Sequence, residues 1–247
     1  MIEFKGVKKA FGSKVVLRGV NLTVGKSEVV FIVGSSGAGK SVLVKHLIGL
    51  LRCDAGEIWL DGKEISRMRE EDFYEIRKKC CYIFQHSTLF DSMSVLDNVA
   101  LPLRKGRGLT VAASRKTAME RLEMVQMESY AHRFPAELGA GLQKRVAIAR
   151  GLTLDPAYVI YDEPTTSLDP VSARRVDALI RDMSKRVNVT SLVVSHDLTS
   201  IFTVADRVAM LYRGDFLIDG PPAALKNSTN PVVQQYVRGQ ADGPMET

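Results

Sequence analysis

Gly34-Ser35-Ser36-Gly37-Ala38-Gly39-Lys40-Ser41 is the stretch that decides the fold of this chain. It has the pattern G-x-x-x-x-G-K-[ST] and directly follows the apolar run Val29-Val30-Phe31-Ile32-Val33. Such a β-branched run predicts a buried strand, and glycines followed by Lys and Ser predict a loop whose backbone N–H groups surround phosphate at the start of a helix. A glycine-rich turn that merely joins a strand to a helix is the alternative, but the strand, the Lys and the Ser together favour the phosphate loop.

The residue types in this loop predict the binding of a nucleoside triphosphate, with ATP and Mg²⁺ as the expected ligands. Lys40 should reach the β- and γ-phosphates, and the Ser41 hydroxyl is a natural ligand for magnesium, which prefers hard oxygen donors. The residues that we expect to contact the phosphates are Gly34, Ser35, Ser36, Gly37, Ala38, Gly39, Lys40 and Ser41.

Length and composition indicate one compact enzyme domain with a large core, because the 247 residues are 45% hydrophobic and 25% charged. No apolar run approaches the roughly 18 residues of a membrane span, and Met1-Ile2-Glu3 opens a strand-like pattern instead of a signal peptide. The odd set of Cys53, Cys80 and Cys81 lacks C-x-x-C spacing, which favours a reducing compartment. We therefore expect a cytoplasmic protein whose contact with a membrane is indirect.

The net charge of +6 is mild, because 34 basic residues are offset by 28 acidic ones. The densest basic run comprises Arg104, Lys105, Arg107, Arg115 and Lys116. A solvated surface is the favoured interpretation of this run, and a contact with lipid headgroups or a partner is the alternative. Nucleic acid is an unlikely partner on this charge balance.

Local patterns along the chain predict a parallel α/β sheet. Short β-rich runs between residues 2 and 33 indicate an antiparallel sheet that leads into the strand before the phosphate loop. Further strands are expected at 56–61, 80–84, 158–161 and 191–194, and helices at 41–51, within 63–79, over much of 86–152 and at 171–186. Alternating strands and helices predict parallel strands, and the absence of an internal repeat predicts a single nucleotide site.

A second chemical cluster is Asp162-Glu163 at the end of the strand Tyr158-Val159-Ile160-Tyr161. Neighbouring residues on a strand point in different directions, so the two carboxylates can have different roles. Asp162 is expected to hold magnesium directly or through water, and Glu163 is the candidate general base for an attacking water. Solvated acidic residues often end strands, but the upstream phosphate loop favours catalysis here.

The order of these motifs resembles the nucleotide-binding domain of ABC-type ATPases. Gln85 follows the strand that ends at Phe84, Ser167-Leu168-Asp169 follows the carboxylates, and His196 follows Val193-Val194-Ser195. The resemblance implies that Gln85 contacts magnesium or water and senses a membrane partner. It also implies that Asp169 lies in a loop crossing between protomers and that His196 contacts the γ-phosphate.

The resemblance covers about residues 2–225 and implies a RecA-like P-loop NTPase core, an N-terminal antiparallel β subdomain and an inserted α-helical subdomain at about 87–150. The ATP-binding domain is then expected at 1–230, followed by a C-terminal tail at 231–247. Phe11 occupies the position of an aromatic residue that stacks on adenine in this family, a role that a flat π surface suits. A core phenylalanine is the alternative for Phe11.

The stretch Leu138-Gly139-Ala140-Gly141-Leu142-Gln143 departs from the family pattern Leu-Ser-Gly-Gly-Gln. In the family this helix start reaches across a head-to-tail dimer to the γ-phosphate held by the other subunit. Gly139, Ala140 and Gly141 are therefore expected to contact nucleotide, although Gly139 lacks the serine hydroxyl. A lost hydrogen bond to a charged group is worth about 1.5 to 3 kcal/mol, so we predict a slow but active ATPase.

Residues 88–99 and 230–239 look like the ATPase of Mla/Mce-type lipid transporters, in which a permease helix docks after the glutamine and the tail holds the ATPase dimer together. Leu89, Phe90 and Met93 form an apolar patch that suits such a helix, with ordinary packing as the alternative. The tail carries apolar residues at helical spacing. We expect them to form one apolar face of a helix, which packs either on its own domain or on a neighbouring protomer.

These patterns together predict the ATP-hydrolysing subunit of a bacterial ABC transporter that moves phospholipid or a related hydrophobic substrate across the cell envelope. The expected assembly is a homodimer bound to integral membrane permease subunits on the cytoplasmic face of the inner membrane. The alternatives are the ATPase of another ABC importer, a non-transport ABC ATPase, and a low-turnover regulatory nucleotide-binding subunit.

Overall fold

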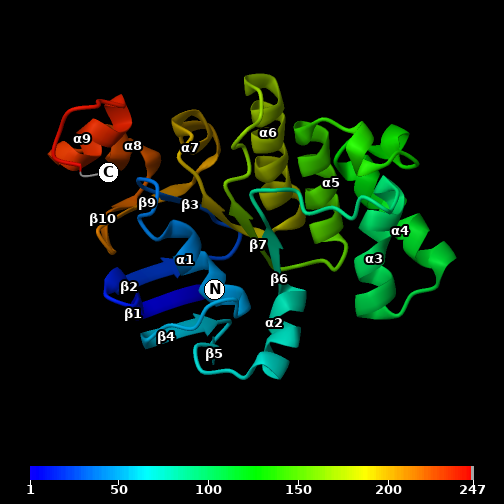
Figure 1. Ribbon diagram of the computed structural model, residues 1–247, viewed down its shortest axis with the longest axis horizontal. Coiled ribbons are helices and arrows are strands. Elements are labelled where there is room, and N and C mark those ends of the chain that lie inside the picture. The colour runs from blue at the N-terminus through cyan, green and yellow to red at the C-terminus, as the bar shows by residue number, and fades with distance from the viewer. Residues whose placement is uncertain (246–247) are drawn as a thin grey trace.

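The computed structural model describes residues 1–245, and within them the strands form two sheets flanked by helices (Figure 1). The smaller sheet is antiparallel and has the order β2-β1-β4-β5. Its strands are β1 (Ile2–Phe11), β2 (Lys14–Val24), β4 (Ala55–Leu60) and β5 (Lys63–Glu64). This sheet is the predicted N-terminal subdomain, and the Asp61-Gly62 turn joins β4 to β5 as the sequence indicates.

The larger sheet has the order β10-β9-β3-β8-β7-β6, and only β10 runs antiparallel to its neighbour. Its strands are β3 (Val29–Val33), β6 (Cys80–Ile83), β7 (Tyr158–Asp162), β8 (Thr190–Val194), β9 (Arg207–Tyr212) and β10 (Asp215–Gly220). The carboxyl ends of parallel strands meet at one edge of a sheet. The phosphate loop after β3, the carboxylates of β7 and His196 after β8 therefore come together.

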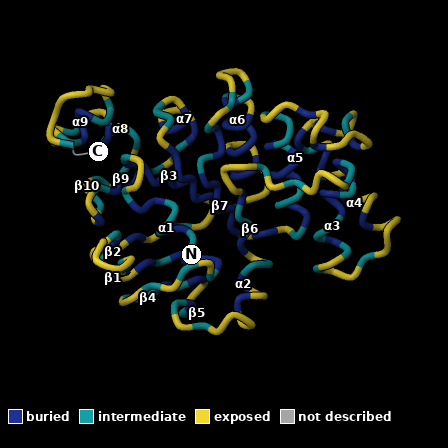
Figure 2. Tube along the Cα trace, viewed as in Figure 1, coloured by how far each residue is buried: buried dark blue, intermediate teal, exposed yellow. Residues whose placement is uncertain are grey.

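Helices cover the large sheet because its central strands are apolar on both faces. Val29, Phe31 and Val33 of β3 belong to one hydrophobic cluster, and Val30 and Ile32 belong to another. This alternation follows the two-residue period of a strand, and the buried trace in Figure 2 follows these strands. The helices outside the inserted subdomain are α1 (Lys40–Lys45), α2 (Phe73–Lys79), α6 (Pro170–Val187), α7 (Leu198–Val204), α8 (Pro222–Lys226) and α9 (Pro231–Arg238).

The inserted helical subdomain contains α3 (Val95–Arg107), α4 (Val111–Met124) and α5 (Ala140–Leu152), at the right of Figure 1. Side-chain caps fix two helix starts, since the Ser94 hydroxyl accepts from the Asp97 amide and the Thr110 hydroxyl accepts from the Ala113 amide. No helix within residues 1–245 is both long and apolar enough to cross a bilayer. The predicted α/β architecture with two added subdomains is confirmed.

One detail differs from the prediction made on sequence, and another concerns an alternative that the sequence left open. The helix expected at 41–51 is shorter, because α1 passes into a 3-10 turn and Gly49 then adopts a left-handed backbone with φ of 70°. The helix α9 packs on its own domain through fully buried Val233, which is the intramolecular alternative for the tail. The last two residues of the predicted 231–247 tail lie outside the described residues.

Candidate active site

The phosphate loop has a backbone that only glycine accommodates at two positions. Gly34 has φ of 143°, and an added Cβ there would lie 2.2 Å from the Leu211 carbonyl oxygen. Gly39 has φ of 103°, and a Cβ there would lie 2.7 Å from a methyl group of Val16. The loop is therefore tightly packed against β9 and β2, and α1 begins directly after it at Lys40.

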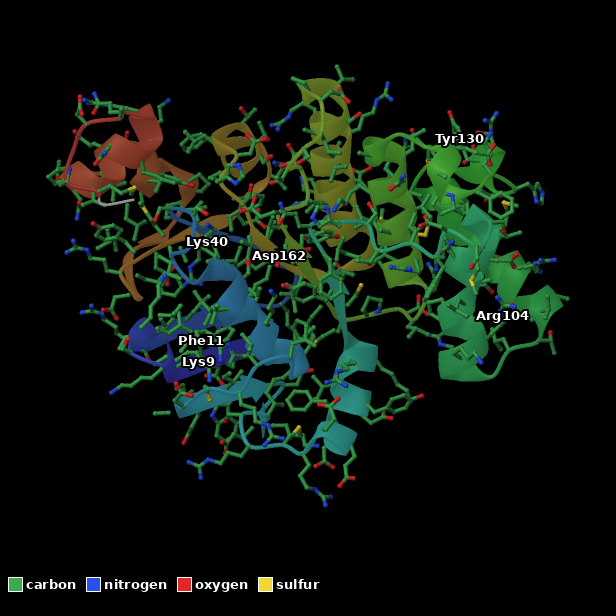
Figure 3. All side chains as sticks on the ribbon, viewed as in Figure 1. Lys9, Phe11, Lys40, Arg104, Tyr130 and Asp162 are labelled. Atoms are coloured by element: carbon green, nitrogen blue, oxygen red, sulfur yellow. The ribbon has the colours of Figure 1, made fainter. Side chains whose placement is uncertain are left out.

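Lys40 is almost fully buried at the floor of the loop (Figure 3). Its ammonium donates to the carbonyl oxygens of Gly34 and Ser35, each at 2.9 Å. Burial lowers the pKa of Lys40, while the carboxylates of Glu163 and Asp162 oppose this shift. A cation held by neutral carbonyls near two acids is available to an incoming phosphate.

Ser41 and Asp162 meet although 120 residues of chain lie between them. The Ser41 hydroxyl donates to Asp162 Oδ1 at 2.6 Å, and the Tyr82 hydroxyl donates to Asp162 Oδ2 at 2.7 Å. A hydroxyl beside a carboxylate is a donor set of hard oxygens, which fits Mg²⁺. Tyr82 was missed by the sequence analysis, because nothing in the local pattern of β6 marks its hydroxyl.

Glu163 turns away from the strand that carries it. Its backbone is left-handed, with φ of 53°, and its amide donates to the Val194 carbonyl at 2.9 Å. Its carboxylate lies 2.8 Å from His196 Nδ1 and accepts from the Thr166 hydroxyl at 3.0 Å. The Glu163 side chain is 14% exposed and that of His196 is 61% exposed, so the acid is sheltered beside an accessible imidazole.

One cavity of about 880 Å³ brings the predicted catalytic residues together. Lys40, Ser41, Gln85, Glu163 and His196 line it with Gly34, Ser35, Ser36 and Gly37 of the loop. A buried cation, a base and a hydroxyl–carboxylate pair can together hold a polyphosphate and accept a proton from water. The structure thus assembles most of the site that the sequence predicted.

The C-terminal tail also lines this cavity, which the sequence analysis did not predict. Gln235 is buried, and its side-chain oxygen accepts from the Met245 amide at 2.6 Å. The Tyr236 hydroxyl is buried near the Gly34 amide and Glu163 without meeting hydrogen-bond geometry with any residue from 1 to 245. Burial raises the pKa of Tyr236 to about 12. The tail is thus a neighbour of the phosphate loop in the single chain.

Phe11 lies apart from this cavity, at the tip of the β1–β2 hairpin opposite Lys14. The residue is 48% exposed, and the Lys9 ammonium lies 5.3 Å from its ring centroid (Figure 3). Lys14 and Val16 line a second cavity together with Tyr212 and Ser35–Ala38 of the loop. The core alternative does not hold for an exposed ring, and stacking on adenine remains a prediction.

Gly139, Ala140 and Gly141 do not line the cavity of their own phosphate loop. Gly139 caps α5 without a side-chain bond, and both Gly139 and Ala140 are exposed. An added Cβ at Gly141 would lie 2.7 Å from the Ser172 side chain, so this glycine permits close contact between α5 and α6. The exposed start of α5 is available to a second chain.

Asp169 caps the start of α6, where its carboxylate accepts from the amides of Val171 and Ser172, each at 3.0 Å. Hydrogen bonds from Ser172 lower the pKa of Asp169. Because Ser172 also contacts Gly141, Asp169 and the start of α5 are held in one unit. A role for Asp169 between protomers remains a prediction.

Restoring the family pattern with Gly139→Ser and Ala140→Gly should raise turnover about tenfold, because the new hydroxyl adds a hydrogen bond to a charged phosphate. A Cβ at Gly139 would meet no heavy atom within 4 Å, so the serine fits without strain. Steady-state phosphate release at saturating ATP checks this. Gly139→Ala is the control, since it adds the Cβ without the hydroxyl, and equal rates for the double variant and the parent would show that the departure has no consequence.

Two buried polar side chains of the helical subdomain escaped the sequence analysis. Lys144 donates to the carbonyl oxygens of Phe84 at 2.8 Å and Gln85 at 2.6 Å, and burial lowers its pKa to about 8. Asn98 is fully buried and bonds to both the amide and the carbonyl of Phe90. Its amide also donates to Met93 and Ser94 carbonyls, so Asn98 shapes the loop that carries the predicted apolar patch.

The basic run is partly neutralised by neighbouring acids. Arg107 pairs with Asp155 at 2.9 Å, and Arg115 pairs with Asp97 at 3.1 Å. Exposed pairs of this kind contribute little stability, and they neutralise two of the five basic side chains of the run. This agrees with a solvated surface.

Comparison with known proteins finds that residues 17–166 match the ABC transporter family. The chain is 39% identical to the probable ribonucleotide transport ATP-binding protein mkl of Mycobacterium leprae, over 99% of this chain and 70% of that protein. It is 35% identical to the intermembrane phospholipid transport system ATP-binding protein MlaF of Haemophilus influenzae, over 99% of this chain and 93% of that protein.

The fold is similar to that of the ATP-binding cassette MJ0796, whose dimeric post-hydrolysis structure holds ADP and phosphate. The TM-score is 0.81 at 30% identity, and the match covers 90% of this chain and 99% of that one. That structure holds the products of ATP hydrolysis, and this chain places its loop, carboxylates and histidine on a similar architecture.

Proposed function

Because the chain belongs to the ABC transporter family and is an ATPase, we propose that it is the subunit that powers transport of phospholipid or a related hydrophobic substrate. The observation that carries the choice of substrate is the likeness to MlaF, which extends over 93% of that phospholipid transport protein. The cargo passes through permease subunits, and this chain supplies the free energy of ATP hydrolysis from the cytoplasmic face of the inner membrane.

We assign the steps of hydrolysis to the residues of the cavity. Lys40 binds the β- and γ-phosphates, and Glu163 accepts a proton from the water that attacks the γ-phosphorus. His196, 2.8 Å from that carboxylate, orients it and contacts the γ-phosphate, while Gln85 positions the water. Magnesium, held through Ser41, Asp162 and Gln85, would offset negative charge on the phosphates.

The working assembly is a head-to-tail homodimer. Gly139, Ala140 and Gly141 lie outside the cavity of their own loop, and Gly139 and Ala140 are exposed. The start of α5 in one protomer then completes the γ-phosphate site of its partner. The dimeric state of MJ0796 with ADP and phosphate supports this arrangement. Preferential binding of ATP to the closed dimer drives closure, and product release reopens it.

Removing residues 227–247 should raise the dissociation constant of the ATP-bound dimer about tenfold, because the tail is proposed to contact the partner as well as its own domain. Sedimentation velocity with MgATP measures this. Val233→Ala in the full chain is the matched control, since it loosens the buried anchor of α9 and keeps the rest of the tail. Unchanged dimerisation after truncation would reject the role between subunits.

A groove beside Gln85 suits a helix of the permease. A cavity of about 450 Å³ between α5 and the segment after β6 is lined by Ile48, Phe84, Pro102 and Leu154. Phe90, which is 50% exposed, lies in the loop that follows this segment. Exposed apolar side chains around an apolar groove are typical of sites where an amphipathic helix docks. This supports a membrane partner that contacts the chain next to Gln85.

The proposed function is tested by isolating the tagged chain from native membranes and identifying bound subunits and lipids by mass spectrometry. We expect integral membrane subunits and phospholipid to copurify with the wild type, and Phe90→Asp to lose them. Phe202→Asp on α7 is the control, because Phe202 is exposed to a similar degree but is not part of the predicted apolar patch of Leu89, Phe90 and Met93. Recovery of soluble partners alone would favour a non-transport ATPase.

A second candidate cargo is suggested by the likeness to the mkl protein, whose name refers to ribonucleotide transport. A ribonucleotide is polar and would leave no lipid enrichment in the purified complex. Turnover of the same complex that is stimulated by a ribonucleotide other than ATP, and not by phospholipid, would favour this candidate over the first. We retain phospholipid because the match to MlaF covers nearly the whole of that protein.

A further inference from the structure

The segment Gln85–Thr88 links the large sheet to the helical subdomain and has few constraints of its own. Phe84 separates it from β6, it begins with Gln85, and Thr88 at its end has a left-handed backbone with φ of 47°. No backbone–backbone hydrogen bond holds these four residues within the described part of the chain. Its conformation must therefore be set by side chains.

Two cations of α5 bind the carbonyl oxygens of this segment and of the residue before it. The Lys144 ammonium donates to Phe84 and Gln85, at 2.8 and 2.6 Å. The Arg150 guanidinium donates to the Thr88 carbonyl at 3.0 Å and to the Ser87 carbonyl at 3.4 Å. Four carbonyl groups are thus held by one helix.

Lys144 is costly to bury. It is 2% exposed, and no carboxylate lies within ion-pair distance of it among residues 1–245. Asp162 is the nearby negative group that favours its charged form. An ammonium without a paired carboxylate destabilises a fold by several kcal/mol relative to an apolar side chain, so packing alone does not account for a lysine here.

We propose that Lys144 is a positioning residue whose ammonium fastens the Gln85 backbone to α5 and so fixes where the Gln85 side chain enters the phosphate cavity. Gly139 and Ala140, at the start of the same helix, then move together with Gln85. Gln85, Ala140 and Lys144 line one cavity of about 300 Å³ together with Leu168. The inference rests on the proposed role of Gln85 in positioning water.

Lys144→Met removes the donors and keeps the length of the side chain. We expect turnover to fall at least about tenfold with less than a twofold change in KM for MgATP, because a displaced positioning group affects the transition state more than nucleotide binding. Lys144→Arg should recover most of the turnover. In a Gln85→Ala background, Lys144→Met should add less than a twofold loss, since both changes remove the same function.

Limited proteolysis of the full chain with proteinase K gives a readout independent of turnover, and cleavage within residues 85–88 should be at least about tenfold faster in Lys144→Met. Arg145→Met is the matched control, because Arg145 donates to the Val125 and Gln126 carbonyls and does not touch this segment. Equal cleavage rates in the two variants, or additive losses with Gln85→Ala, would overturn the proposal. If Gln85→Ala alone leaves turnover unchanged, the assigned role of Gln85 fails, and the cleavage result still decides whether Lys144 holds the segment.

Discussion

Lys40→Ala is expected to weaken MgATP binding about 100-fold, because two charge-assisted hydrogen bonds to phosphate contribute about 3 kcal/mol together. The ammonium lies at the floor of the loop between Gly34 and Ser35, and no other lysine or arginine lines this cavity. The loop carbonyls that it binds would also lose their partner. Isothermal titration calorimetry of the full chain with MgATP measures the effect.

Lys45→Ala is the control for this prediction, because Lys45 is in the same helix and does not line the cavity. Its affinity for MgATP should stay within about twofold of the wild type, as is usual for a surface charge away from a site. Thermal unfolding of both variants separates lost binding from lost folding. A folded Lys40→Ala protein that keeps the affinity of the wild type would contradict the assignment of the phosphate site.

Glu163→Gln should lower turnover at least about 100-fold and leave MgATP affinity within a few-fold of the wild type. The amide has the shape of the carboxylate and can still accept from Thr166, but it cannot take the proton of the attacking water. Because ATP is bound and not hydrolysed, the closed dimer should also accumulate. Single-turnover phosphate release and sedimentation with MgATP measure the two effects.

Glu120→Gln is the control, since Glu120 is an exposed acid on α4, outside the cavity. It should leave both turnover and dimerisation unchanged. Asp162→Asn distinguishes the two neighbouring carboxylates, because it should raise the magnesium concentration needed for activity. Turnover of Glu163→Gln above a tenth of the wild-type rate would assign the proton to another group.

The parts of the site that the sequence revealed are those encoded by local pattern. The loop from Gly34 to Ser41 and the pair Asp162-Glu163 each require particular residue types within a few positions. Topology then explains why they meet, since the large sheet brings the carboxyl ends of β3, β7 and β8 to one edge. Such a meeting is predictable once a parallel sheet is inferred.

The residues that escaped prediction act through contacts that no local pattern reports. Lys144 binds carbonyls that lie 59 and 60 positions away, and Tyr82 reaches Asp162 across 80 positions. Asn98 looks like any polar residue at a helix start until its burial is known. The place of Tyr236 beside the phosphate loop depends on how α9 docks, and an amphipathic pattern gives the face of a helix without its destination.

The left-handed backbone at Glu163 has a consequence for how this enzyme can change over time. A residue with a Cβ is held there at an expense of about 1 kcal/mol, whereas glycine would adopt the same φ freely. Selection for greater thermal stability therefore favours glycine at position 163, whereas selection for ATP hydrolysis favours the acid. Homologues that no longer hydrolyse ATP can therefore replace this acid, and replacing it with glycine should raise their thermal stability.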